Sequence, residues 1–138
     1  MSADRGHAHR RSLVAACLVA LLGLIPAEGH ACGACAEDKI AATYDDGVTR
    51  KATAAGDTLV YCEVAGPLDR HRWAAATRRV AGIRAQSVRT SEQPATLSFA
   101  VDPKLQTPQG AVEATQRGLP AATRLSIVRV VETDVPRR

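Results

Sequence analysis

From residue 58 onward, the spacing of apolar positions alternates between strand-like and helix-like patterns. Strands are indicated by β-branched or alternating runs, and helices by apolar residues three or four positions apart. The predicted elements, in chain order, are a strand over 59–64, a helix that follows Asp69 and ends near Gly82, strands over 87–91 and 96–101, a helix that follows Thr107-Pro108 and ends near Gly118, and a strand over 124–131.

The helices carry their apolar residues on single stripes. Trp73, Ala76, Val80 and Ile83 form the first stripe, and Val112, Thr115 and Leu119 form the second. Leu97, Phe99 and Val101 alternate onto one face of their strand. The order strand, helix, strand, strand, helix, strand predicts an α+β fold of the ferredoxin-like, split βαβ type, with a four-stranded antiparallel sheet.

A further helix is predicted ahead of this unit, over residues 36–55. Ile40, Tyr44, Val48 and Ala52 recur every four positions, and Gly56 follows as a C-terminal stop. Gly47 is a weak point within it. Because the two other helices would cover one face of the sheet, we expect the stripe of Ile40, Tyr44 and Val48 to cover the open face.

Residues 1–31 are expected to be a secretory signal peptide. Three arginines precede an apolar run over 13–25, which is shorter than the roughly 20 residues of a membrane-spanning helix. Small residues permit cleavage after Gly29 or Ala31, so the mature chain would begin at His30 or Cys32. We expect export, to the bacterial periplasm, with no transmembrane segment in the mature chain. Lipidation of Cys32 is disfavoured, because Gly29 stands where lipoprotein signals carry leucine.

The length, charge, composition and motifs of the chain exclude several classes of function. A chain of 138 residues with a net charge of +4 holds one ordinary domain and excludes a large multidomain enzyme. Its basic residues are interspersed with acidic ones rather than clustered, and aromatic residues make up only 3%, which argues against nucleic-acid binding. No Ser-His-acid set, paired carboxylates, phosphate-binding glycine loop or His-Glu-x-x-His motif occurs in the sequence, so we predict a protein that is not an enzyme.

The predicted layout is a signal peptide over 1–31, a cysteine pair and helix over 32–57, the ferredoxin-like domain over 58–132 and a tail over 133–138.

The candidate chemistry lies in the sequence Cys32-Gly33-Ala34-Cys35, directly before the first predicted helix. Two thiols at this spacing can bind one soft metal ion, Cu(I) or Zn(II), or close a small disulfide. A structural disulfide that pins the terminus, and thiol–disulfide exchange with a partner, remain alternatives. Thioredoxin-like enzymes place such a pair after a buried strand, and no strand is predicted here.

Two further residues are possible metal ligands. Cys62 shares a strand face with Val60 and Val64, which favours a small core residue, but it would complete a three-sulfur Cu(I) site if the N-terminal segment folded back. His30, if it survives cleavage, would add an imidazole and an α-amine beside the two thiols. His71 is a weaker candidate, because a solvent-exposed histidine is the commoner outcome at the start of a helix.

Over residues 58–131 the order of elements resembles the heavy-metal-associated (HMA-type) ferredoxin-like domains of copper and mercury chaperones. The resemblance implies a small carrier that binds one soft ion and passes it on by ligand exchange. That family places Met-x-Cys-x-x-Cys in the loop after the first strand, whereas residues 65–69 here contain no thiol. None of the family's ligands can therefore be assigned to this chain.

Together these features predict an exported carrier of a soft metal ion that uses Cys32 and Cys35 and transfers the ion to another protein. The main alternative is a protein-interaction module, in which a Cys32–Cys35 disulfide is only a staple and the open sheet face or the N-terminal helix binds a partner.

Overall fold

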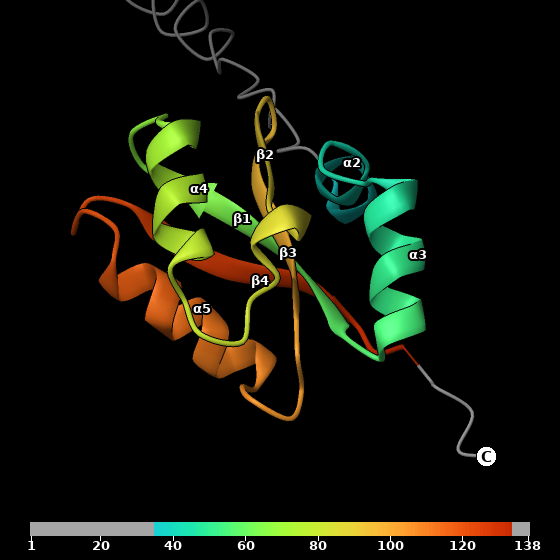
Figure 1. The fold of residues 1–138 in the computed structure, drawn as a ribbon. Helices are drawn as coiled ribbons and strands as arrows, with labels where there is room; N and C mark the ends of the chain where they lie inside the picture. The colour runs from blue at the N-terminus through green and yellow to red at the C-terminus, as the bar shows by residue number, and fades with distance from the viewer. Residues whose placement is uncertain (1–34, 134–138) are drawn as a thin grey trace, which may run out of the picture. The chain divides into compact units, whose positions relative to one another are not determined.

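The computed structural model describes residues 35–133. Its elements are α2 (Ala36–Ala41), α3 (Asp46–Ala55), β1 (Thr58–Ala65), α4 (Arg70–Arg78), the 3-10 turn η2 (Ala85–Ser87), β2 (Arg89–Glu92), β3 (Ala95–Val101), α5 (Pro108–Arg117) and β4 (Arg124–Val131). The strands form one antiparallel sheet in the order β2-β3-β1-β4 (Figure 1). The predicted ferredoxin-like α+β class is confirmed. The predicted signal peptide and residues 134–138 of the predicted tail lie outside the described residues.

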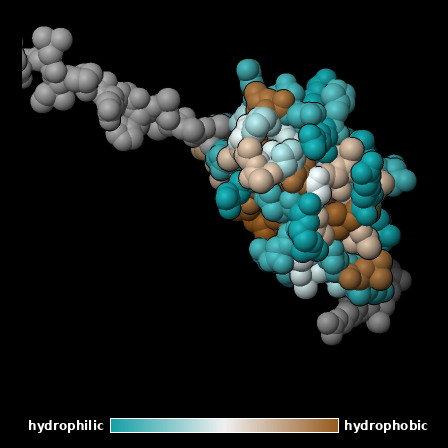
Figure 2. All heavy atoms as spheres, turned by 90° about the vertical axis from the view of Figure 1, so that its left-hand side faces the viewer, coloured by the Kyte–Doolittle hydropathy of each residue, from teal (hydrophilic) through white to brown (hydrophobic). Residues whose placement is uncertain are grey.

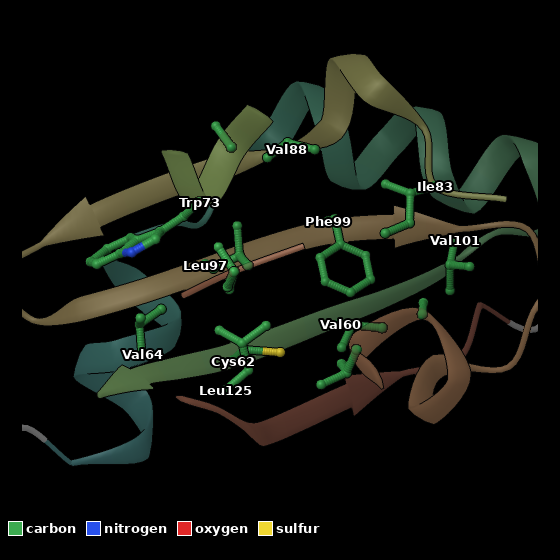
Figure 3. Packing of buried hydrophobic residues seen from close by; sticks show 14 residues of the cluster. Val60, Cys62, Val64, Trp73, Ile83, Val88, Leu97, Phe99, Val101 and Leu125 are labelled. Atoms are coloured by element: carbon green, nitrogen blue, oxygen red, sulfur yellow. The ribbon is translucent and has the colours of Figure 1, made fainter. Parts of the chain in front are cut away.

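The main hydrophobic core lies between the sheet and the helices α4 and α5 (Figure 3). Trp73 of α4 is 1% exposed, as its helical spacing predicted. The sheet contributes alternate residues of its two central strands, namely Val60, Cys62 and Val64 from β1 and Leu97, Phe99 and Val101 from β3. On the outer side of these helices, Figure 2 shows hydrophobic residues in small separate groups among hydrophilic ones.

The helices α2 and α3 pack on the opposite face of the sheet. Ile40 and Val48 contact a second buried cluster that consists of Ala52, Leu59, Tyr61 and Ala100. The prediction that the N-terminal segment covers the open face is therefore confirmed for Ile40 and Val48. It is wrong for Tyr44, which is 53% exposed. Because α2 and α3 pack on this face, the surface left to the interaction-module alternative is the N-terminal helix segment itself.

The predicted single helix over 36–55 is in fact two helices. The first ends at Ala41, and Asp45 then caps the second by accepting a hydrogen bond from Val48 N at 2.9 Å. The link between them is tied to the sheet, because Ser98 Oγ donates to the carbonyl oxygen of Thr43 at 3.2 Å. The aspartate cap and this contact with β3 end the helical run, and Tyr44 turns outward as a result.

The helix α4 is also shorter than its apolar stripe suggested. It ends at Arg78, so Val80 and Ile83 lie beyond it. Ile83 instead forms an isolated bridge with Val101, and Gly82, with φ of +87°, makes the turn that brings the chain to the edge of β3. Pairing of the backbone with β3 therefore replaces the last helical turn.

The helix starts predicted at Asp69 and Thr107 are confirmed. The carboxylate of Asp69 accepts a hydrogen bond from Arg72 N at 3.0 Å, and the hydroxyl of Thr107 accepts one from Gly110 N at 3.0 Å. The predicted hairpin of β2 and β3 is present, although β2 begins at Arg89 and residues 85–87 form η2.

Candidate functional site

Cys35 lies at the start of α2 and is exposed to solvent. Its thiol donates a hydrogen bond to Asp38 Oδ2 at 3.1 Å, and the backbone N–H of Cys35 donates to the same oxygen at 3.3 Å. A thiol in this position is accessible to a metal ion, an oxidant or another protein. The local sequence explains the arrangement, since an acidic residue three positions after a helix cap commonly bonds back to it.

Ion pairs and one apolar contact hold α2 against the sheet. Glu37 pairs with Arg129 of β4 at 2.5 Å, and Lys39 pairs with Glu63 of β1 at 2.9 Å. Ile40 of the same helix packs against the second buried cluster. Cys35 is thus attached to a helix that is anchored to two strands, which gives its thiol a defined place at the edge of the folded domain.

Cys62 occupies a different environment. It is 1% exposed and belongs to the main core on the α4 and α5 side of the sheet, where Figure 3 shows its sulfur among apolar side chains. Burial raises the pKa of its thiol to about 12. Cys35 belongs to the helix layer on the other side, so the fold does not bring these two sulfurs together.

The remaining predicted ligands are either outside the described residues or isolated. Cys32 and His30 fall outside them. His71 is an exposed residue of α4. Within residues 35–133, no three histidine, cysteine or acidic side chains cluster in a way that could hold a metal ion. Nor does this part of the chain include a helix with the length and apolar character needed to cross a bilayer.

The structure also contains a pocket that the sequence did not reveal. It has a volume of about 300 Å³ and lies between α3 and the segment that joins α4 to β2. Val48, Ala52, Ala55 and Ala100 supply apolar lining. We call this space the α3 pocket. Its residues come from three separate regions of the chain, and no local motif connects them.

Two ion pairs line the α3 pocket. Asp57, whose side chain is 4% exposed, accepts hydrogen bonds from Arg84 Nε at 2.8 Å and Nη2 at 2.9 Å. The bond to Asp57 raises the pKa of Arg84. Asp45 accepts a hydrogen bond from Arg89 Nε at 2.9 Å. The pKa of the Asp45 carboxyl is lowered mainly by the hydrogen bond from the backbone N–H of Val48, and next by the bond from Arg89.

Comparisons of this chain with protein-family models, with curated proteins and with solved structures found no match.

Proposed function

We propose that this protein is exported, binds one soft metal ion through the thiolates of Cys32 and Cys35, and transfers the ion to a partner protein. Cu(I) is the first candidate, and Zn(II) and Hg(II) are the next, because thiolates are the ligands that such ions prefer. The observation that carries the proposal is the exposed thiol of Cys35 at the start of an anchored helix.

The placement of Cys35 suits transfer better than storage. Two thiolates leave the coordination sphere of Cu(I) or Zn(II) open to a further ligand, and His30 would supply one only if it is retained. The exposed position of Cys35 allows a partner's thiolate to approach and exchange ligands. On this proposal the protein binds and delivers an ion and catalyses no reaction.

The full-length sequence is expressed in a bacterial host, which processes it, and the product is reduced. The test is an anaerobic titration of this protein with Cu(I), in which a chromophoric Cu(I) chelator competes for the ion. We expect the chain to withdraw one Cu(I) from the chelator. The double variant Cys32→Ser, Cys35→Ser should withdraw none, whereas Cys62→Ala should behave like the parent chain because Cys62 is enclosed in the core. Unchanged stoichiometry in the double variant would refute the proposal.

An intact mass of the chain from its native compartment separates metal binding from a disulfide. A metal-free chain that is lighter by two hydrogen atoms would show a Cys32–Cys35 bridge and contradict the metal-carrier proposal. The reduction potential of such a bridge would then divide the alternatives. A value of about −120 to −270 mV would indicate thiol–disulfide exchange, and one below about −300 mV would indicate a structural staple.

A further inference from the structure

The α3 pocket has the size and lining of a small-molecule site. Its volume of about 300 Å³ is near the lower end of the range for ligand pockets, which are mostly apolar with a few polar groups. It corresponds to about ten water molecules at roughly 30 Å³ each, enough for one aromatic ring that carries a small substituent.

The carboxylates of the pocket are already engaged. Both oxygens of Asp57 accept hydrogen bonds from Arg84. In Asp45, Oδ1 accepts from Val48 N and Oδ2 accepts from Arg89 Nε. Each of the four carboxylate oxygens therefore has a partner within the protein, and the two acids do not offer a free charged acceptor to a ligand.

The cationic residues of the pocket, in contrast, retain free donors. Arg84 directs Nε and Nη2 to aspartates, and Arg89 uses Nε and Nη1, so one amino group of each guanidinium has no hydrogen-bond acceptor among residues 35–133. Lys51, an exposed residue of α3, lines the same pocket and forms no ion pair within that range. The pocket thus combines an apolar lining with unused cationic donors.

We propose that the α3 pocket binds a small organic carboxylate with an apolar body, which contacts Val48, Ala52 and Ala55 while its carboxylate meets Lys51 and the free guanidinium groups. Charge-assisted hydrogen bonds of this type are about twice as strong as neutral ones. This site is separate from the proposed metal site, because Cys35 is not among the residues that line the pocket. Either proposal can therefore fail alone.

The full-length sequence is expressed with ¹⁵N label in a bacterial host, which processes it. The test is an NMR titration of this protein with benzoate and, separately, with the neutral analogue benzamide. Benzoate should shift the amide signals of α3, of residues 84–89 and of Ala100 in a saturable manner, with a dissociation constant of about 1 mM or below. Benzamide should bind at least about tenfold more weakly, since it lacks the charge.

Two pocket variants and one control variant localise the effect. Lys51→Met should weaken benzoate binding severalfold, whereas Lys104→Met, which removes the same charge from an exposed residue outside the pocket, should leave it unchanged. Ala55→Leu places bulk in the pocket at an exposed position and should abolish binding while the NMR spectrum stays dispersed. The proposal is overturned if no shift saturates, if benzamide binds as well as benzoate, or if Lys104→Met weakens binding as much as Lys51→Met.

Discussion

Replacement of Cys62 by serine tests whether the core around β1 is as dry as the structure indicates. The side chain is 1% exposed and lies in an apolar cluster that includes Val60, Val64 and Phe99. Its strand is paired on both sides, with Leu97 of β3 and Ile127 of β4 opposite this residue. The register of β1 against β4 shifts between Tyr61 and Cys62, but the side chain of residue 62 lies among apolar neighbours, so a serine hydroxyl would be buried there without a dedicated partner.

The cost follows from the burial of that hydroxyl. An unsatisfied buried hydroxyl lowers the free energy of unfolding by about 1–3 kcal/mol. Cys62→Ala leaves a space of about one methyl group, which costs about 0.5–1.5 kcal/mol, but buries no polar atom. We therefore expect serine to be more destabilising than alanine at this position. For a domain of this size each 1 kcal/mol lowers the Tm by about 4–8 °C.

The assay is urea and thermal unfolding of the reduced, metal-free chain, followed by circular dichroism. Cys35→Ser is the matched control. It makes the same chemical change at an exposed position, so it should alter the free energy of unfolding by no more than about 0.5 kcal/mol. If Cys62→Ser proved as stable as Cys62→Ala, water or a polar partner would have to reach residue 62, and the assignment of Cys62 to a dry core would be wrong.

Three further predictions concern the thiols and one tight turn. In the native, reduced protein Cys35 should react with a thiol reagent at once and Cys62 only after denaturant is added; rapid modification of Cys62, located by mass spectrometry, would contradict its burial. Burial raises the pKa of the Cys62 thiol from 9.0 to about 12, so as the pH rises the unfolded chain loses the thiol proton before the folded chain does. The free energy of unfolding should therefore fall between about pH 9 and pH 12, by up to about 1.4 kcal/mol per pH unit. The fall should be smaller in Cys62→Ala, which lacks the thiol. Gly66→Ala should destabilise the protein by about 1–3 kcal/mol in urea unfolding, since φ is +114° and the added methyl group would collide with the carbonyl oxygen of Ala122; a neutral effect would refute this turn geometry.

Local patterns were sufficient to predict most of the fold. The run over 124–131 coincides with β4, and the caps at Asp69 and Thr107 act within a few residues of themselves. The order of elements followed from such short-range signals, and few topologies are compatible with that order. The antiparallel four-stranded sheet was therefore accessible from the sequence.

The errors in the predicted helices arose where a contact distant in sequence overrode the local period. The bond from Ser98 to the backbone of Thr43 is such a distant contact, and together with the local cap at Asp45 it divides the segment over 36–55. Ile83 fits the stripe of α4, but it pairs with Val101 of β3 instead. Apolar spacing cannot distinguish a residue buried by a helix from one buried beside a strand.

One candidate site was visible in the sequence and the other was not. The sequence by itself identified the cysteine pair at positions 32 and 35 as a candidate site, because residue type and spacing are local properties. The strand face that Cys62 shares with Val60 and Val64 indicated a core position, which the structure confirms. Only the tertiary structure showed that this core lies on the opposite side of the sheet from α2, and only it assembled the α3 pocket. Lys51, Arg84 and Ala100 are far apart along the chain, so their proximity depends on how α3 packs against the sheet. A pocket of this kind has no signature in a single sequence.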